Sequence, residues 1–182
     1  MAEKILYTSW DSPCGTLMLA SVDDKLIMTD WVNGWHHSSI MKRFDNLLGL
    51  PFLEKTSAVI ERAIDELNEY FLGRRKEFDL PLELFGTAFQ IQVWEALKEI
   101  GYGQTVSYAD IARKISNPKA IRAVGGAVGL NPLSIIIPCH RVVGTNGSLT
   151  GYAGGLDVKI KLLKHEGVDM SRLFRPQKGT AL

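Results

Sequence analysis

Residues 135–142 read IIIPCHRV, which places a cysteine directly after three β-branched apolar residues and a proline. The apolar residues predict a buried strand over Ile135–Ile137, and the proline suits its end because it fixes φ and lacks an N–H. His140 and Arg141 follow Cys139 and offer it a base and a fixed positive charge. Because such neighbours favour the nucleophilic thiolate, the run predicts a reactive cysteine. A buried core cysteine is the alternative that the run alone leaves open.

The residues on both sides of this run predict a mostly helical region. Apolar spacing and capping residues indicate helices over 87–100, Tyr108–Lys114 and Lys119–Gly129 before it. A glycine-rich loop, Gly144–Gly155, and a last helix, Val158–His165, are expected after it. The second and third helices follow each other in the order of a helix-turn-helix.

The second helix of this pair is unusually slim, with Arg122 as its one cation after Lys119 at its start. Its small residues are Ala120, Ala123, Gly125, Gly126, Ala127 and Gly129. A major-groove reader offers several long polar side chains to base edges, whereas a slim helix suits the narrow minor groove. The alternative is a helix whose small residues pack against another helix. Each glycine costs about 1 kcal/mol relative to alanine inside a helix, so some compensation is needed.

The first third of the chain has a different character. Apolar-rich runs over Lys4–Trp10, Thr16–Val22 and Lys25–Val32 are separated by turn residues, which predicts an antiparallel meander. Helical spacing follows over Thr56–Leu72, while the histidine pair at 36–37 reads as loop.

The expected fold class is therefore α/β (α+β), a small antiparallel sheet-plus-helix domain followed by a mainly helical domain with a helix-turn-helix. We place the first domain at 1–85, the second at 86–170 and a polar tail at 171–182. A chain of 182 residues is long enough for two small cores of this kind.

Charge is distributed unevenly between the two halves. Residues 1–86 carry 9 Lys and Arg against 14 Asp and Glu, a balance of −5, while residues 87–182 carry 12 against 6, a balance of +6. The basic half suggests an anionic partner such as nucleic acid. The chain shows no apolar stretch that could span a membrane and no signal pattern, and its two cysteines fit a reducing compartment. We expect a cytoplasmic protein.

The segment from 87 to 167 closely resembles the O6-alkylguanine-DNA alkyltransferases, also called methylated-DNA–protein-cysteine methyltransferases. The resemblance rests on FQIQVW, GQTVSYADIA, NPKAIRAVGGAVGLNP, IPCHRVVGTNG, GYAGGLDVK and LLKHEG, which occur in that order. The preceding residues fit the family's variable, RNase H-like N-terminal domain only loosely. The resemblance implies repair of O6-alkylguanine, and of O4-alkylthymine, in double-stranded DNA by a protein that acts once and as a monomer. It implies no cofactor.

The resemblance also implies catalytic roles for five residues. Cys139 would accept the alkyl group, and His140 would take the thiol proton through a water molecule. Glu166 would orient that histidine and favour its charged form. Tyr108 would contact the flipped base, and Asn131 would brace the turn before the active-site segment.

DNA-binding and pocket roles are carried over in the same way. Arg122 would fill the gap left in the stack by the flipped guanine. The resemblance places Ser107, Ala120, Ala123, Gly125 and Gly126 against DNA. It places Val142, Tyr152, Ala153 and Lys159 around the guanine pocket.

The chemistry of the residues agrees with this assignment, since a base inside a duplex must leave the stack before a thiolate can reach it. Neighbours in a regular strand point to opposite faces, so Cys139 and His140 would need a bridging water or a bend. No metal site is expected, because Cys14, His36 and His37 lack ligand spacing. Two other functions remain open: a sensor that binds alkylated bases without chemistry, and a cysteine hydrolase using Cys139.

Overall fold

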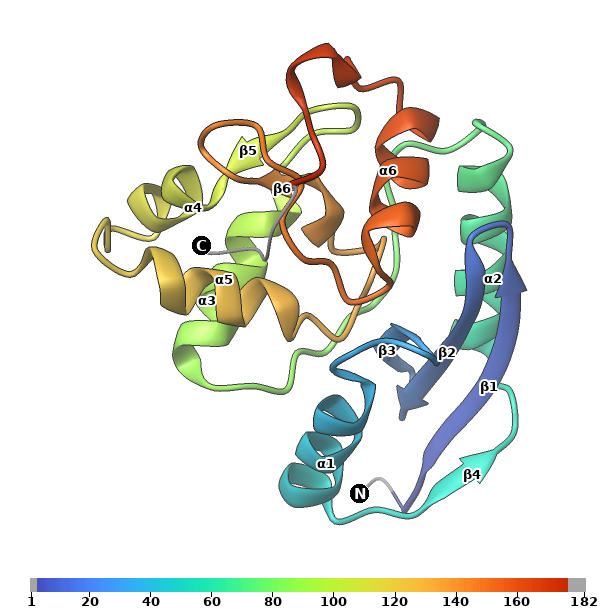
Figure 1. Cartoon of the computed structure of the whole chain (residues 1–182). Coiled ribbons are helices and arrows are strands. Elements are labelled where there is room, and N and C mark those ends of the chain that lie inside the picture. The colour runs from blue at the N-terminus through green and yellow to red at the C-terminus, as the bar shows by residue number, and fades with distance from the viewer. Residues whose placement is uncertain (1–2, 177–182) are drawn as a thin grey trace. The chain divides into compact units, whose positions relative to one another are not determined.

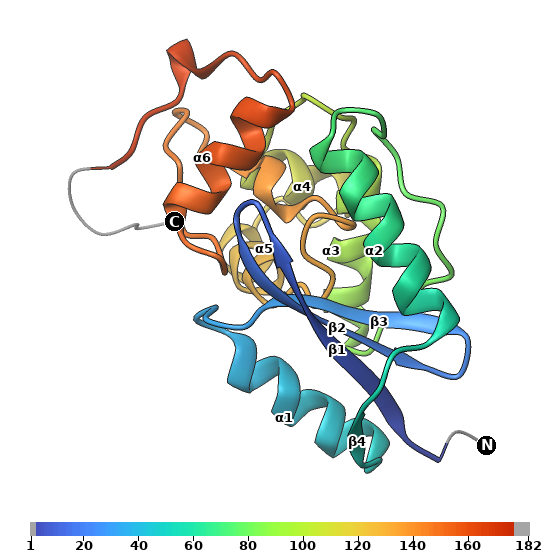
Figure 2. The same ribbon diagram turned by 90° about the vertical axis from the view of Figure 1, so that its right-hand side faces the viewer.

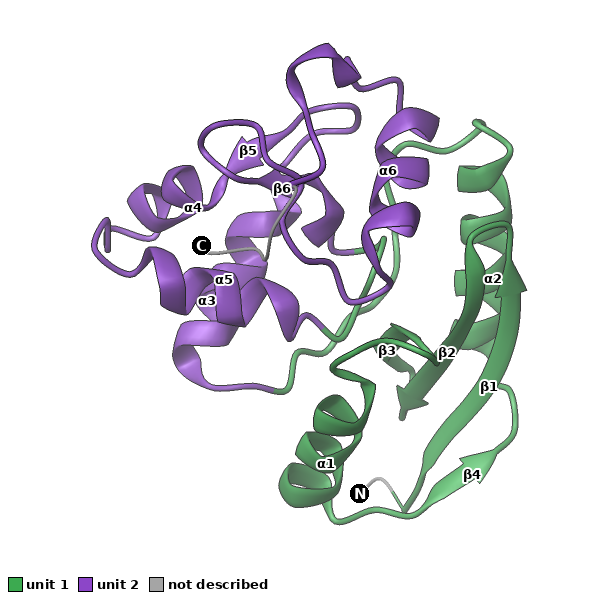
Figure 3. Ribbon diagram, viewed as in Figure 1, with its two compact units in different colours: residues 1–85, 132–136 green, residues 86–131, 137–182 purple. Residues whose placement is uncertain are grey.

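The computed structural model describes residues 3–176, and the chain divides into two compact units (Figure 3). The first contains residues 1–85 and 132–136, and the second contains residues 86–131 and 137–182. A short piece of the second half of the sequence therefore belongs to the first unit. The end of the predicted polar tail, 177–182, lies outside the described residues.

The first unit is built on a four-stranded sheet with the strand order β3-β2-β1-β4. Strands β1 (Ile5–Ser12), β2 (Gly15–Val22) and β3 (Lys25–Trp31) form the predicted antiparallel meander. Strand β4 (Phe52–Glu54) pairs with β1 in parallel and was not foreseen. Its three residues, of which only Phe52 is partly buried, give too weak a periodicity to mark a strand in the sequence.

Two helices cover the opposite faces of this sheet (Figure 2). Helix α1 (His37–Leu48) packs Ile40 and Phe44 into the core around Ala20 and the other residues on that face. Helix α2 (Ala58–Phe71) begins at the Ser57 cap, whose hydroxyl bonds Ser21 on the other face.

The prediction of a loop at the histidine pair was wrong for one residue. His36 is the N-cap of α1, but His37 is its first helical residue. The imidazole Nδ1 of His37 lies 2.7 Å from a carboxylate oxygen of buried Asp30 on β3. This tertiary contact, invisible in the local sequence, accompanies the start of the helix.

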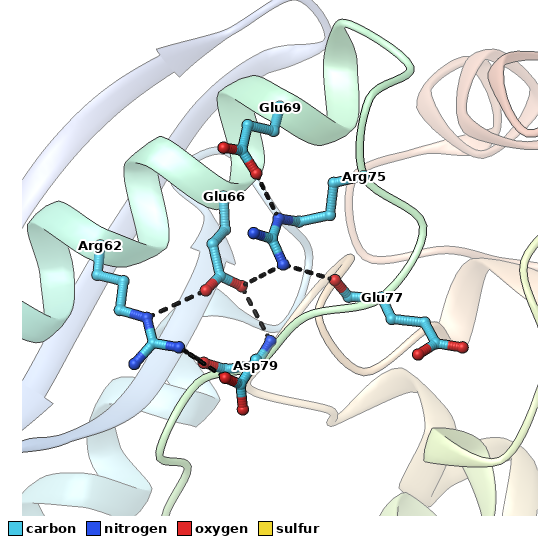
Figure 4. A network of polar contacts seen from close by, with 6 residues as sticks. All are labelled: Arg62, Glu66, Glu69, Arg75, Glu77 and Asp79. Carbon is cyan, nitrogen blue, oxygen red and sulfur yellow. Dashed lines mark hydrogen bonds and ion pairs between the residues drawn. The ribbon is translucent and has the colours of Figure 1, made fainter.

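A polar network fastens the segment after α2 to that helix (Figure 4). Buried Glu66 accepts hydrogen bonds from Arg62 at 3.1 Å and from the backbone N–H of Asp79 at 3.0 Å, and Arg75 lies 3.4 Å away. Arg75 also donates to Glu69 at 2.7 Å. A carboxylate with several donors of this kind can be buried without an unmatched charge.

The second unit is mainly helical (Figure 1). Its elements in chain order are α3 (Ala88–Lys98), β5 (Val106–Ser107), α4 (Tyr108–Lys114), α5 (Ile121–Gly129), a 3₁₀ helix (Cys139–Arg141), β6 (Val142–Val143), α6 (Leu156–His165) and a second 3₁₀ helix (Met170–Arg172). Capping boxes at Thr87 and Ser107 begin α3 and α4, as the sequence predicts. The α/β fold class, with its sheet-containing first part and helical second part, is confirmed.

The strand predicted over Ile135–Ile137 is not formed. Ile135 adopts φ 72°, a left-handed conformation that a β-branched residue rarely takes, and this breaks the extended run. Cys139 instead opens the 3₁₀ helix. Between residues 3 and 176, no helix is long and apolar enough to cross a membrane.

Candidate active site

Cys139 is nearly buried, and its sulfur lies at the end of an amide hydrogen bond. The Nδ2 group of Asn131 donates both to Cys139 Sγ at 3.1 Å and to the carbonyl oxygen of Ile137 at 2.9 Å. Asn131 lies just after α5, so a single side chain ties the end of that helix to the cysteine. An N–H directed at sulfur favours the thiolate over the thiol.

His140 and Glu166 form a second pair in the same unit. His140 Nε2 lies 2.7 Å from Glu166 Oε1, and both side chains are fully buried. Glu166 caps the C-terminus of α6, and the turn after it is permitted by Gly167 with φ 75°. Glu166 is only 5% exposed, so it is not an ordinary solvent-exposed helix end.

Arg141, which the sequence places beside Cys139 as a fixed charge but to which no role at Glu166 was assigned, completes this cluster. Its Nε donates to Glu166 Oε2 at 2.8 Å, and its Nη2 donates to Oε1 at 3.0 Å. Gly103 donates its N–H to Oε2 at 3.1 Å with φ 73°, and a Cβ there would lie 2.8 Å from the Glu166 carbonyl oxygen. The Glu166 carboxylate thus accepts hydrogen bonds from His140, from Arg141 twice and from the Gly103 N–H. The position of Arg141 within PCHRV was the only signal for this role in the sequence.

The protonation of these groups follows from burial and from the four donors. Burial alone would raise the pKa of Glu166, but the hydrogen bonds from His140 and Arg141 outweigh it and hold that pKa far below its usual range. Burial lowers the pKa of His140, and the bond to Glu166 only partly offsets this. This direction favours the neutral imidazole over the charged form that the resemblance implies for His140.

A neutral His140 has one proton to place on two nitrogens. Nε2 faces a carboxylate and so carries the proton, which leaves Nδ1 as the basic nitrogen. Nδ1 is buried and has no hydrogen-bond partner among the described residues. The contact with Glu166 thus determines the tautomer of His140 and leaves Nδ1 as a basic nitrogen.

Lys159 is a further buried charged group of the site. Its Nζ donates to the carbonyl oxygens of Val142 at 2.5 Å and Thr150 at 3.3 Å. Burial lowers the pKa of Lys159 to about 8, and the nearby Cys139 charge opposes that shift. The same Thr150 donates through its hydroxyl to the Tyr108 hydroxyl at 2.8 Å. Thr150, which sequence reasoning did not single out, thereby joins Lys159 to Tyr108.

The other expected pocket residues lie close to this cluster. Tyr152 and Ala153 are both nearly buried, and the Tyr152 ring meets the His140 ring edge-on with 6.5 Å between centroids. Among the described residues, no three His, Cys, Asp or Glu side chains are grouped so that they could hold a metal ion.

Helix α5 has one packed and one open side. Trp94 of α3 donates its indole N–H to the Ala127 carbonyl oxygen at 2.8 Å, and Ala127 is buried. Arg122, Ala123 and Gly126 are exposed, and a Cβ added to Gly126 would meet nothing within 4 Å. Packing thus explains the small residue at 127 but not the one at 126.

Three further residues expected at DNA are placed differently. Ala120, the N-cap of α5, and Gly125 are half-buried. The hydroxyl of Ser107 is used within the protein, where it accepts from the Asp110 N–H at 3.1 Å and donates to the Asp110 carboxylate at 2.6 Å. The structure brings the catalytic candidates together, whereas Arg122 lies apart from them on the open side of α5.

Comparison with known proteins identifies relatives of both parts of the chain. Residues 5–84 match the family described as 6-O-methylguanine DNA methyltransferase, ribonuclease-like domain, and residues 88–168 match its DNA binding domain. A Methylated-DNA--protein-cysteine methyltransferase of Methanosarcina acetivorans is 44% identical over 161 residues, which cover 88% of this chain and 97% of the relative. One of Haemophilus influenzae is 40% identical, with 90% and 87% covered.

A solved structure agrees with these relatives. The crystal structure of Mycobacterium tuberculosis OGT in complex with DNA superimposes with a TM-score of 0.79 at 42% identity, covering 92% of this chain and 94% of that one. The crystal structure of an O6-methylguanine-DNA methyltransferase from the hyperthermophilic archaeon Pyrococcus kodakaraensis is more distant, with 24% identity and a TM-score of 0.62, and has a similar fold.

Proposed function

Because the chain belongs to the methylated-DNA–protein-cysteine methyltransferase family, we propose that it repairs DNA by moving the alkyl group of O6-alkylguanine onto Cys139. One observation supports this above the others: the cysteine sulfur accepts from Asn131, while the adjacent His140 keeps an unpartnered basic nitrogen. The proposed nucleophile and base are thus adjacent in the sequence and belong to the same compact unit.

The proposed reaction balances without a cofactor. The thiol proton passes to His140 Nδ1, through a water molecule, and the thiolate attacks the alkyl carbon. The new S–C bond forms as the O6–C bond breaks, and guanine leaves with the electron pair and takes up a proton. Glu166 and Arg141 keep His140 oriented, and Lys159 supplies positive charge near the thiolate. The thioether is stable, so each molecule reacts once. O4-alkylthymine would react in the same way.

DNA binding is assigned to the open side of α5. Helix α4, the turn after it and α5 would act as a helix-turn-helix that enters the minor groove, with the protein bound as a monomer. The small side chains there permit close approach to the groove floor, and Arg122 would take the place of the flipped base. Tyr108 would contact that base, while Val142, Tyr152, Ala153 and Lys159 would surround it. Ser107 has its hydroxyl engaged in the α4 cap, so only a contact through its backbone fits this proposal.

Mass spectrometry of the protein after mixing with a duplex that contains O6-methylguanine tests the proposal. We expect a gain of one methyl group, located on the peptide that contains Cys139, in a one-to-one ratio with repaired guanine. Tight binding without a mass gain would indicate a sensor instead. Repeated turnover of an ester or amide substrate would indicate a hydrolase.

Replacement of Arg122 by alanine is expected to slow transfer from duplex DNA about 30-fold, because flipping a base costs a few kcal/mol and the arginine offsets part of that cost. Transfer from free O6-methylguanine needs no flipping and should change less than about twofold. Second-order rates on both substrates measure the difference. Arg74→Ala removes the same charge from an exposed position of the first unit, outside the proposed DNA-binding helices, and serves as the control. Equal losses on duplex and free base would contradict the role of Arg122.

Replacement of Gly126 by alanine separates protein stability from DNA binding. Inside the protein the new methyl group meets open space, and alanine favours a helix by about 1 kcal/mol, so the variant should be more stable. If α5 presses into the minor groove, the same methyl group obstructs it and affinity for duplex DNA should fall about tenfold. Thermal melting and a binding titration give the two values. Unchanged affinity would argue against insertion of this side of α5.

A further inference from the structure

Strand β3 is an end strand of the sheet, and its outer edge pairs with part of the chain that leads to Cys139. Thr29 on β3 donates its N–H to the Pro132 carbonyl oxygen at 2.9 Å, and its own carbonyl oxygen accepts from the Ser134 N–H at 2.8 Å. Its hydroxyl donates to the Ser134 carbonyl oxygen at 2.8 Å. Thr29 is fully buried, so one residue of the first unit makes three protected hydrogen bonds to this segment.

The segment that Thr29 holds lies between two contacts of the active site. Asn131 immediately precedes it and donates to Cys139 Sγ, and Ile137 immediately follows it and accepts from Asn131. The chain thus leaves the second unit after Asn131, runs through residues 132–136 of the first, and returns two residues before Cys139. A shift of 132–136 would therefore displace Asn131 and Ile137, which are hydrogen-bonded to each other beside Cys139.

This segment also stores backbone strain. Ile135 is buried and β-branched, yet it adopts φ 72°. Such a conformation persists only where neighbouring contacts determine it, and it is found preferentially at functional sites. Thr29 fixes the residues just before Ile135, and Asn131 fixes the residue two positions after it. Without the Thr29 contacts, the turn would be free to relax toward an unstrained conformation.

We propose that Thr29 is a positioning residue for the alkyl transfer, which holds the strained segment 132–136 so that Cys139 is presented to Asn131 and to the substrate. The inference rests on the proposed function for its role in transfer. It gives the first unit a task in the reaction, although that unit contributes none of the catalytic side chains. Thr29 acts through the backbone and touches no reacting atom.

The test compares Thr29→Val with Thr29→Ser. Valine keeps the β-branched shape and both backbone bonds but removes the hydroxyl, whereas serine keeps the hydroxyl. In a Cys14→Ser background, the probe is the rate of Cys139 alkylation by free O6-methylguanine and, separately, by iodoacetamide across a pH series. We expect Thr29→Val to react about fivefold more slowly at each pH, as befits one buried hydrogen bond. Thr29→Ser should retain the wild-type rate within about twofold.

Ser21→Ala provides a matched control for general destabilisation. Ser21 is a buried residue of the same unit, and its hydroxyl bonds Ser57 rather than the 132–136 segment. Its loss should lower the melting temperature but leave Cys139 alkylation unchanged. Equal rates for Thr29→Val and wild type, or an equal loss in Ser21→Ala, would overturn the positioning role. Failure of the wild type with O6-methylguanine but normal iodoacetamide results would instead overturn the proposed function.

Hydrogen exchange of the unmodified protein gives a measurement that does not depend on the fold of any variant. If Thr29 holds the segment, the Ser134 N–H should exchange as slowly as the N–H groups of the β2–β3 ladder, because both open only with the first unit. Exchange of Ser134 at least about 100-fold faster than that ladder would mean that the segment opens by itself, and would overturn the inference.

Discussion

Cys139→Ala is expected to abolish alkyl transfer completely while leaving the fold and the affinity for undamaged duplex DNA unchanged. The proposed thioether forms on the Cys139 sulfur, and the other cysteine of the chain, Cys14, belongs to the first unit. Alanine removes a single buried heavy atom, which should change stability by only about 1 kcal/mol. The exposed side of α5 is untouched. Mass spectrometry after incubation with methylated duplex, circular dichroism melting and a binding titration measure the three properties.

The second cysteine is the natural control for this variant. Cys14 lies in the turn between β1 and β2 of the first unit and is only partly buried. Cys14→Ser should therefore retain the wild-type extent and rate of methyl transfer. Transfer that survives in Cys139→Ala, or that disappears in Cys14→Ser, would place the acceptor elsewhere.

Glu166→Gln is expected to slow transfer about 100-fold and to destabilise the second unit by about 3 kcal/mol. Both carboxylate oxygens accept from donors, so the amide group of glutamine must direct its own N–H groups at a donor. Beside His140, the conflict is relieved only if Nε2 becomes an acceptor. The proton then moves to Nδ1, and the basic nitrogen that should receive the thiol proton is lost. Arg141 is left with an uncompensated buried charge.

Glu66→Gln is a closely matched control for this substitution. Glu66 is a buried carboxylate of the first unit that also accepts from an arginine and a backbone N–H. It should lose comparable stability with no change in the rate of Cys139 alkylation below the melting temperature. A normal transfer rate for Glu166→Gln, with the wild-type pH profile, would reduce Glu166 to a structural role.

The pKa shifts of the cluster give a direction for the pH dependence of stability. The folded state depresses the pKa of Glu166 below its unfolded value of about 4.3, so the stability that it contributes is present above that pH and is lost as the pH falls. The folded state also depresses the pKa of His140, so protonation of the unfolded chain below about 6.5 acts in the same direction. Glu166→Gln should therefore show a shallower loss of stability as the pH falls below about 5.

Local sequence determined the helices and strands whose capping and turn residues lie within a few positions of one another. The bounds of α4, Tyr108–Lys114, follow from the Ser107 cap, and the meander follows from alternating apolar runs separated by turn residues. The family, and with it the α/β fold class, could be recognised because the motifs around PCHRV are themselves contiguous. A cap or a tight turn depends on residues three or four positions apart, so it can be recognised from the sequence without knowledge of the tertiary structure.

Tertiary structure alone decided how the reactive groups are arranged. Glu166 and His140 are 26 positions apart in the sequence, and Thr29 and Ser134 are 105 apart. Arg141 completes a carboxylate cluster that no spacing predicts. The β-branched run before Cys139 has the local preference of a strand, yet Ile135 turns left-handed. Local propensity is worth at most about 1 kcal/mol per residue, and the buried contacts of Thr29 and Asn131 on either side of Ile135 override it. The sequence thus predicted which residues belong to the candidate site, while long-range hydrogen bonds decided how these residues are arranged.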